Sequence, residues 1–238
     1  MINEVRNTVL FILNKDNNGY ITPSQFNLYA KQAQTEIFEG YFHDYSRAVN
    51  KRNVHGHTSG FSDIPKRLEE VIDRFTSVAA LDYSGVTGTF SIPPNMPPAY
   101  SMGTVTLASG LVDVDKVSQG QLARLRSSLD TSPSVNYPVY TINENGLQVF
   151  PTTFSTTGDI IANYVRYPAT PKWTYNSFSG GEPLFNQSAV GYQDFELPSS
   201  DEMNLIIRIL QYAGVEIREA DVVKMATAQE VQTKMENQ

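Results

Sequence analysis

Cysteine is absent from the 238 residues of the chain, and histidine is scarce. The lack of cysteine excludes disulfide bonds, a thiolate nucleophile and zinc or iron–sulfur sites with cysteine ligands. The three histidines are His43, His55 and His57. A zinc site could use the "HGH" pair and His43, but no helix fixes their spacing, so exposed loop histidines are the favoured interpretation.

Long apolar runs and an excess of positive charge are also missing. The run "VLFIL" at residues 9–13 is too short for a signal sequence or a membrane span. We therefore expect a soluble protein, without membrane association, that folds in a cytosol. Lys and Arg number 18 against 25 for Asp and Glu, a net charge of −7. Such an acidic balance disfavours tight binding of nucleic-acid phosphates.

The order of the patterns along the chain is helices, then short β-type runs, then helices, which predicts an α+β fold. We expect an N-terminal helical region at residues 1–77 that contains a mobile loop at 45–63. A central antiparallel β region, sandwich- or barrel-like and with one short helix, should follow at 78–198. C-terminal helices should occupy residues 199–238, all within one integrated domain.

Several local signals fix the expected elements. Residues 2–13 have a helical apolar stripe, and Thr22-Pro23 with Gln25 predicts the start of a second helix that runs to about Tyr41. Another helix should begin near Pro65, and Asn145-Gly146 is a hairpin signal.

At the C-terminal end, Ser199 or Ser200 should cap a helix that ends at Gly214. A second helix is expected over residues 218–234.

The stretch "NKDNNGYITPSQF" resembles a calcium-binding loop at residues 14–25. Asn14, Asp16 and Asn18 would stand at the first, third and fifth places, with Gly19 at the sixth and Gln25 at the twelfth. Calcium requires a bidentate carboxylate at the twelfth place, and Asp16 is the single acid of the loop. We favour a tight turn between two helices and keep weak metal binding as the alternative.

No sequence motif predicts catalysis. The chain has no nucleophile elbow, metalloprotease helix, P-loop or dinucleotide fingerprint. Asp113 and Asp115 share one side of a strand, but a solvent-facing strand side is the simpler interpretation. We therefore expect a protein that is not an enzyme and has no cofactor or resident metal.

Aromatic residues gather in "NYVRYPATPKWTYNSF", between residues 164 and 178. The prolines make such a segment extended and stiff, and its rings would suit pockets on a neighbouring subunit. Sugar binding and core packing are the alternatives. Arg47, Lys51 and Arg52 form a basic stretch that could contact phosphate or an acidic neighbour, or could be solvated surface.

Three segments together resemble virion structural proteins of crAss-like tailed bacteriophages. The first is "INEVRNTVLFILNKDNNGYITPSQFNLYAKQAQTEIF". The second is "PVYTINENGLQVFPTTFSTTGDIIANYVRYPATPKW", in which a strand ends in Y-x-R-x-P-x-x-P-x-W. The third is "DFELPSSDEMNLIIRILQYAGVEIREADVVKMATAQ". In order and spacing they cover about half the chain.

The resemblance implies a head–tail connector, a ring protein of the phage neck or tail. Such a protein forms a homo-oligomeric ring, commonly twelvefold, and connects the portal protein to other neck and tail rings. The ring surrounds the channel through which DNA leaves, without specific binding. It would be assembled in the bacterial cytoplasm and found in the virion. We expect an acidic lumen, which a lumen lined by Arg47, Lys51 and Arg52 would contradict.

A cyclic ring requires that one face of each subunit match a different face of its neighbour. The candidate interface residues are Tyr29, Phe38, Tyr167, Trp173, Tyr175, Arg47, Lys51 and Arg52. Core packing is the alternative for each element, and is favoured for Phe26 and Ile206. The alternative function is a calcium-binding module through loop 14–25, or a carbohydrate-binding module through segment 164–178.

Overall fold

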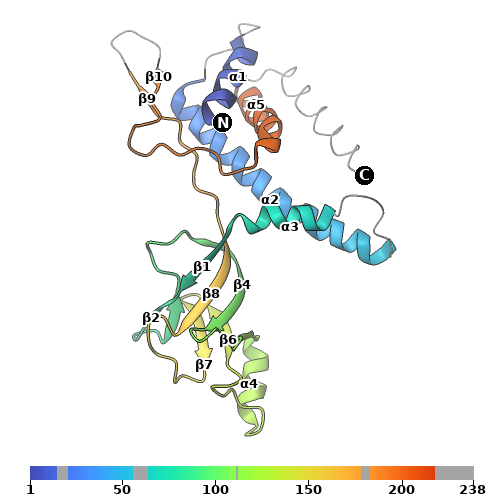
Figure 1. Cartoon of the computed structure of the whole chain (residues 1–238), viewed down its shortest axis with the longest axis vertical. Coiled ribbons are helices and arrows are strands. Elements are labelled where there is room, and N and C mark those ends of the chain that lie inside the picture. The colour runs from blue at the N-terminus through green and yellow to red at the C-terminus, as the bar shows by residue number, and fades with distance from the viewer. Residues whose placement is uncertain (15–20, 56–63, 111, 178–182, 218–238) are drawn as a thin grey trace. The chain divides into compact units, whose positions relative to one another are not determined.

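The computed structural model describes residues 1–14, 21–55, 64–110, 112–177 and 183–217, without the side chains of 51–55, 64–65 and 215–217. The chain divides into two compact units (Figure 1). One unit combines residues 1–71 with residues 168–238, and we call it the helical unit. The other, residues 72–167, is the β-rich unit.

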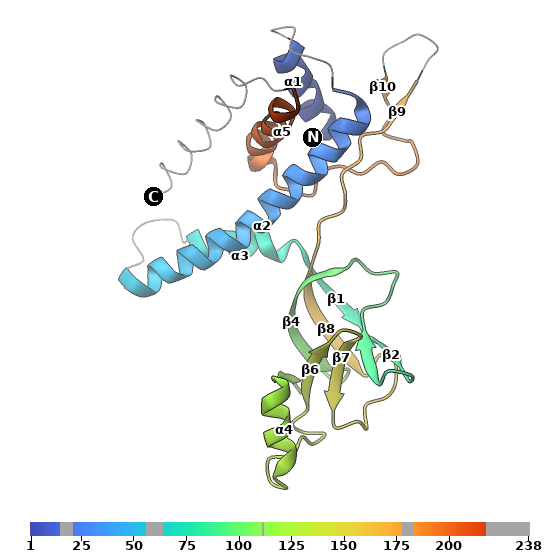
Figure 2. The ribbon, with the colours of Figure 1, turned by 180° about the vertical axis from the view of Figure 1, so that it is seen from behind.

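Three long helices form most of the described part of the helical unit. They are α1 (Ile2–Asn14), α2 (Pro23–His55) and α5 (Glu202–Ile217), the last preceded by a 3₁₀ turn at Ser199–Asp201. Helix α5 packs against both α1 and α2 (Figure 2). Their apolar faces meet in a core that includes Val5, Val9, Phe26, Phe38 and Leu205, all with at most 1% of their surface exposed. Two short strands, β9 (Tyr175–Asn176) and β10 (Leu184–Phe185), pair in the same unit.

The start of α2 has the predicted capping box. The Thr22 backbone N–H donates to Oε1 of Gln25 at 2.9 Å, and the Gln25 N–H donates to Oγ1 of Thr22 at 3.3 Å. This reciprocal pair satisfies backbone donors that the first helical turn leaves without a partner. The Thr22–Gln25 prediction is therefore confirmed.

Helix α2 continues well beyond Tyr41, so the prediction of a mobile loop from residue 45 is wrong for residues 45–55. The stretch "YSRAVNKRNVH" is helical although its apolar periodicity is lost. It contains no Gly or Pro before Gly56 and includes Ala, Arg and Lys, which favour helix. None of the side chains of residues 45–50 is buried, and a helix that buries no apolar face gives no periodic signal. Residues 56–63 lie outside the described residues.

The β-rich unit contains two sheets, whose strands are β1 (Thr76–Ala80), β2 (Asp82–Ser84), β3 (Thr89–Ser91), β4 (Ala99–Leu107), β5 (Asp115–Lys116), β6 (Val139–Asn143), β7 (Gly146–Phe150) and β8 (Ile160–Arg166). One sheet has the order β1-β8-β4 and the other β2-β3-β7-β6-β5. All pairs are antiparallel except β5 with β6, which is parallel.

Both sheets contribute to one apolar core, in which Leu81, Ile160 and Ala162 meet Phe90 and Leu147. Helix α4 (Gln119–Ser127) has a complete capping box at Ser118 and Gln121, as expected for a short helix at this place. Helix α3 (Ile64–Asp73) leads from the helical unit into β1, in agreement with the helix predicted near Pro65.

The β6–β7 hairpin lies where Asn145-Gly146 predicted one, but the turn is displaced by one residue. Asn143 pairs with Gly146, so Glu144 and Asn145 form the loop and Gly146 is the first residue of β7. Gly146 has a φ of 128°, and a Cβ there would lie 2.3 Å from the carbonyl oxygen of Phe90. The glycine therefore allows β3 to approach the hairpin closely.

Helix α5 passes through Gly214 instead of ending there, so the predicted stop is wrong. Gly214 is buried, as is its neighbour Ala213. A glycine costs a helix interior about 1 kcal/mol relative to alanine, which packing can offset. The helix predicted over 218–234 lies outside the described residues.

The fold is α+β, as the sequence predicts. The sequence placed region boundaries at 78 and 199, and the structure groups the residues into the two units described above. The β-rich unit begins at Ile72 and ends at Tyr167, and the Pro- and aromatic-rich segment after Tyr167 belongs to the helical unit.

Replacing Gly146 by Ala should destabilise the β-rich unit by about 2 kcal/mol or more, because the residue has positive φ and its Cβ would overlap the Phe90 carbonyl. Urea unfolding followed by circular dichroism measures the change. Gly120→Ala is the matched control, since a Cβ at Gly120 in α4 meets nothing within 4 Å. That variant should be neutral or slightly stabilising. Equal effects of the two substitutions would contradict the explanation.

Candidate functional site

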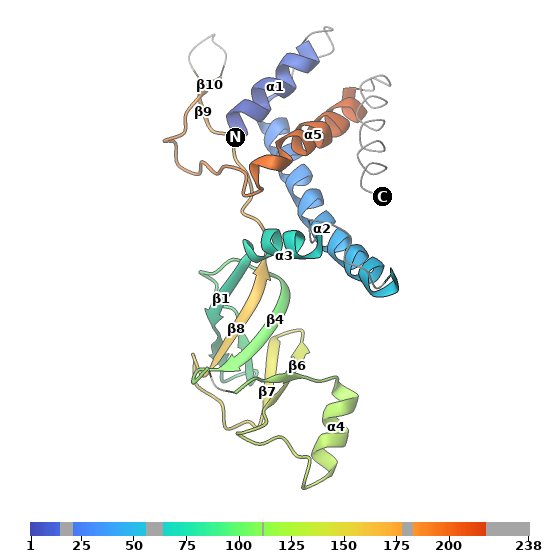
Figure 3. The same cartoon turned by 45° about the vertical axis from the view of Figure 1, so that its right-hand side comes forward.

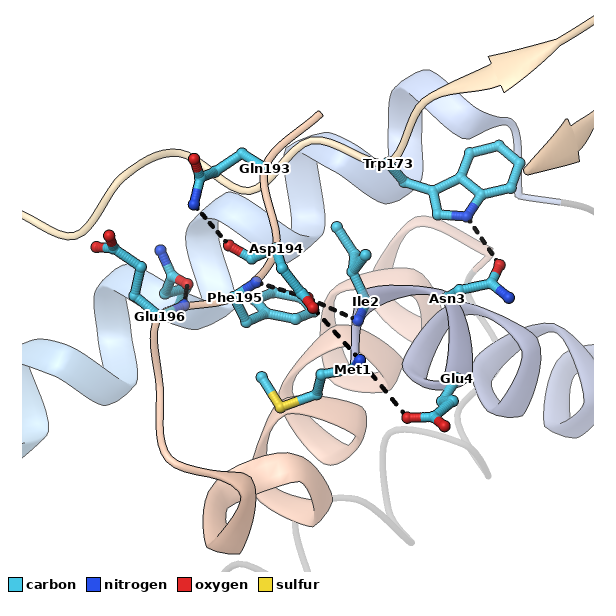
Figure 4. A network of polar contacts seen from close by, with 10 residues as sticks. Met1, Ile2, Asn3, Glu4, Trp173, Gln193, Asp194, Phe195 and Glu196 are labelled. Atoms are coloured by element: carbon cyan, nitrogen blue, oxygen red, sulfur yellow. Dashed lines mark hydrogen bonds and ion pairs between the residues drawn. The ribbon is translucent and has the colours of Figure 1, made fainter. Parts of the chain in front are cut away.

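The segment after Tyr167 is fixed to the helical unit by Trp173, which is 2% exposed. The indole Nε1–H of Trp173 donates to Oδ1 of Asn3 in α1 at 3.0 Å (Figure 4). The side-chain amide of Asn27 in α2 forms two hydrogen bonds with the backbone of Trp173, one as acceptor and one as donor. Its Oδ1 accepts from the Trp173 N–H at 2.8 Å, and its Nδ2 donates to the Trp173 carbonyl at 3.1 Å. Trp173 thus joins two helices to a distant part of the chain.

The indole ring of Trp173 is also covered by other side chains. The guanidinium carbon of Arg6 lies 3.8 Å from the ring centroid, a cation–π contact, and Arg6 itself is 5% exposed. Tyr175 and Phe185 stack against the ring at centroid distances of 5.5 and 5.9 Å. The ring is therefore a buried anchor of strands β9 and β10.

Asp194 makes a second connection between α1 and the segment that leads to α5. Its Oδ1 accepts from the backbone N–H groups of Ile2 and Phe195, each at 2.8 Å (Figure 4). The Met1 amino group lies 3.4 Å from Oδ2 of Asp194. Ile2 is the first residue of α1, so a carboxylate at this place also interacts favourably with the helix dipole.

Gln34 in α2 forms hydrogen bonds with the chain on both sides of Trp173, at Ala169 before it and at Glu196 after it. The Gln34 Nε2 donates to the Ala169 carbonyl at 2.8 Å, and its Oε1 accepts from the Glu196 N–H at 3.1 Å. Oε2 of Glu196 accepts from the Ala169 N–H at 2.7 Å. Gln34 is 1% exposed, so its amide is a buried polar group with both functions satisfied. These bonds complete what we call the clamp, defined as Asn3, Asn27, Gln34, Trp173, Asp194 and Glu196.

Helices α2 and α5 are joined by a separate cluster around Glu36. Arg208 forms an ion pair with Oε1 of Glu36 at 2.7 Å, and the Tyr212 hydroxyl donates to Oε2 at 2.8 Å. Burial and the Glu36 carboxylate raise the pKa of Tyr212 to about 12. Tyr29 stacks on Tyr212 at a centroid distance of 6.4 Å.

The structure separates the predicted interface residues by exposure. Phe38 is 0% and Trp173 2% exposed, so both are core residues and leave the list of surface candidates. Their apolar surface is buried by other parts of the chain, which periodicity in the sequence does not distinguish from a neighbouring subunit. Phe26 and Ile206 are buried at 1% and 8%, as favoured.

The remaining candidates lie on different parts of the chain. Tyr175 and Tyr167 are 44% and 40% exposed, Tyr29 is half-buried and Arg47 is exposed. Tyr175 and Arg47 belong to the helical unit, while Tyr167 packs on Tyr100 in the β-rich unit. Lys51 and Arg52 are within α2, but their side chains lie outside the described residues.

The residues proposed as metal ligands are placed only in part. Residues 15–20 of the calcium-like loop, with Asp16, and His57 lie outside the described residues. Gln25 at the twelfth place is engaged in the α2 cap. His43 is exposed and lies 3.6 Å from Asp44. In the part of the chain that the structure describes, no three His, Asp or Glu residues gather as metal ligands would.

The carbohydrate alternative and the carboxylate pair can be placed as well. Within segment 164–178, Tyr164 is 0% exposed and Trp173 is covered by Arg6, so neither offers a free ring face for a sugar. Phe178 lies outside the described residues. Asp113 and Asp115 are exposed on either side of the buried Val114, in agreement with a solvent-facing strand side.

Comparison with known proteins does not assign the chain to a family. No family model matches the sequence, and no curated protein matches it. The described helices include none with the length and apolar character needed to cross a membrane.

The sequence did not indicate the polar members of the clamp. Asn3 and Asn27 lie at half-buried positions of their helices, where the sequence pattern does not separate a buried asparagine from a surface one. Gln34 is buried, but in the sequence a glutamine within a helix is expected at the surface. Asp194 and Glu196 flank Phe195 near a proline, a pattern without a specific signal. Trp173 was predicted as an interface residue with core packing as an alternative, and the structure buries it within the chain's own helical unit.

Replacing Asn27 by Ala should destabilise the helical unit by about 1–3 kcal/mol, because the Trp173 N–H and carbonyl would both lose a buried partner. Thermal unfolding followed by circular dichroism measures the loss. Gln32→Ala on the exposed side of α2 is the matched control and should change stability by less than about 0.5 kcal/mol. An Asn27 variant as stable as that control would show that the clamp does not hold the segment.

The raised pKa of Tyr212 predicts a loss of stability at high pH. The folded-state pKa of about 12 exceeds the ordinary value of 10, so the contribution of Tyr212 is complete below pH 10 and declines as pH rises toward 12. Urea unfolding of the wild type and Tyr212→Phe between pH 9 and 12 tests this, since the difference between them should shrink over the window. A difference that is constant with pH would contradict it.

Proposed function

We propose that the chain is a non-catalytic structural subunit of a homo-oligomeric ring in the neck or tail of a tailed bacteriophage. In this role it connects the portal to the tail and surrounds the channel for the leaving DNA. Its chemistry is the complementarity of protein surfaces, and its partners are further copies of itself, the portal and other ring proteins.

One observation carries the proposal: the first of the three segments that resemble the phage proteins contacts both the end of the second and the start of the third. Trp173, the last residue of the second segment, bonds Asn3 and Asn27 of the first. Asp194, the first residue of the third segment, bonds the N–H of Ile2 in the first. Residues far apart in sequence thus support one another in the helical unit, as expected if the resemblance follows a shared structural core.

The helical unit also presents apolar side chains that a neighbouring subunit could cover. Phe11 in α1 is 74% exposed, Leu28 in α2 59%, Leu184 in β10 62% and Met203 in α5 59%. Single exposed apolar residues are common on protein surfaces, so exposure alone does not single out one of the four. We therefore treat all four as candidate contacts. Their positions on four different elements allow the two unlike faces that a cyclic interface needs.

The net charge of −7 is compatible with a channel that does not retain DNA. A protein that neutralises few phosphates releases few counterions and binds nucleic acid weakly. The placement of this charge within a lumen is part of the proposal.

Mass photometry and negative-stain microscopy of the full chain, alone and with the portal protein of the same phage, test the proposed ring. We expect closed rings of about twelve copies of the 26.5 kDa chain, formed alone or on the portal. A chain that stays free of the portal and never closes into rings would contradict the proposal.

Single substitutions to Glu at Phe11, Leu28, Leu184 and Met203 locate the contact. A substitution at the interface should prevent ring formation and leave the melting temperature unchanged, because the residue is exposed in the free subunit. Gln32→Glu on α2 adds the same charge at an exposed polar position and serves as the control. Normal rings from all four variants would place the contact elsewhere.

A further inference from the structure

Strands β6 and β7 lie side by side (Figure 3), and the loop that joins them places an asparagine directly before a glycine. Glu144 and Asn145 form this loop, and both side chains are exposed. The backbone carbonyl of Asn145 accepts from Oγ1 of Thr89 at 3.2 Å. None of the described residues forms a hydrogen bond with the Asn145 side-chain amide. Rotation of the side chain can therefore bring the amide carbon close to the peptide nitrogen of Gly146.

The other asparagine of this hairpin is held in place. Asn143 accepts from Nε2 of Gln119 at 2.9 Å and donates to Oε1 of Gln148 at 3.1 Å, so both functions of its amide are satisfied. It also precedes Glu144, whose side chain crowds the next peptide nitrogen, whereas a glycine has no Cβ at that place. Asn18 precedes a glycine as well, but it lies outside the described residues. Within the described part of the chain, a free amide and an unhindered following nitrogen thus coincide in this loop.

We propose that Asn145 is a site of spontaneous deamidation, a modification of the chain that needs no enzyme. The Gly146 peptide nitrogen gives up its proton and attacks Cγ of Asn145, and the side-chain nitrogen takes up a proton and leaves as ammonia. The product is a five-membered succinimide ring. Water then opens this ring at either of its two carbonyl carbons and gives aspartate or isoaspartate. The reacting groups belong to neighbouring residues, so the chain itself keeps them close.

Pairing of the two strands controls the rate in the folded chain. Asn143 pairs with Gly146 at the end of the β6–β7 ladder. The Gly146 peptide has to leave this last pair before its nitrogen reaches Cγ of Asn145, because a paired peptide is held in the ladder. Opening of one terminal pair costs less free energy than unfolding of the whole β-rich unit. The folded chain should therefore react more slowly than the unfolded chain, but without global unfolding.

Isoaspartate at this position would disturb the contact between β3 and β7. Its main chain runs through Cγ, so one extra carbon separates residues 145 and 146. The carbonyl that Thr89 contacts becomes part of a free carboxylate, which adds a negative charge beside Glu144. The extra carbon also displaces Gly146, which lies close to the Phe90 carbonyl. The modification should thus destabilise the β-rich unit, and this effect is independent of the proposed ring.

Incubation of the folded full chain at mildly alkaline pH, followed by digestion and liquid chromatography with mass spectrometry, tests the site. Asn145 should be converted to aspartate and isoaspartate at least about tenfold faster than Asn143. The same measurement in urea gives the rate for the unfolded chain, and circular dichroism shows that the incubated chain stays folded. Asn145→Gln is the matched control, because its amide would have to close a larger ring. That variant should remain unmodified with an unchanged unfolding midpoint.

Urea unfolding of the modified chain separates the two effects of the reaction. Asn145→Asp carries the added negative charge on a backbone of normal length. The isoaspartyl fraction, purified by chromatography, also has the extra main-chain carbon. It should therefore unfold at a lower urea concentration than this variant.

An Asn145 amide that persists in the folded chain as long as the Asn143 amide would overturn the inference. Conversion that occurs only in urea would overturn it too, since the hairpin would then prevent the reaction. An isoaspartyl fraction as stable as Asn145→Asp would contradict the expected effect on the contact between β3 and β7.

Discussion

The burial of Trp173 is the constraint on which the helical unit depends. A tryptophan at 2% exposure has to satisfy its indole N–H, its own peptide groups and both faces of its ring. Asn3, Asn27, Arg6 and the stacked rings of Tyr175 and Phe185 provide these partners, from α1, α2 and the β9–β10 strands. The described residues between 168 and 198 have little regular structure, and the clamp holds them against α1 and α2. The chain can then lead to α5 at a defined place, where Glu36 receives Arg208 and Tyr212.

This arrangement explains why the chain returns to its first helices after the β-rich unit. The β-rich unit is an insertion between α3 and the clamp, with a core of its own shared by its two sheets. Each unit thus buries its own apolar residues. The helical unit exposes scattered apolar side chains, which suit the surface contacts we propose for a ring.

Much of the secondary structure followed from local signals. The Thr22–Gln25 cap, the periodicity of residues 2–13 and the hairpin around Asn145-Gly146 depend on contacts between residues close in sequence, and those predictions were confirmed apart from the one-residue displacement of the turn. Residues 45–55 of α2 were missed because the sequence there has no apolar stripe, and the role of Gly214 was mispredicted because packing overrides its local preference. From the sequence, Trp173 could be singled out in the candidate site, but the residues that surround it could not. Trp173 was predicted as an interface residue, with core packing as an alternative. Its hydrogen-bond partners Asn3 and Asn27 lie more than a hundred positions away in the sequence, and no local pattern connects them to it.

The central claim is that the clamp makes residues 168–198 an integral part of the helical unit. Native-state hydrogen exchange of the Trp173 indole and backbone N–H groups, observed by NMR on the full chain, tests it most directly. Both protons are buried and bonded to asparagine side chains of α1 and α2. They should therefore exchange as slowly as the core amides of α2, through global unfolding of the unit. Fast exchange of Trp173 while the α2 amides remain protected would mean that the segment opens by itself, and would contradict the account.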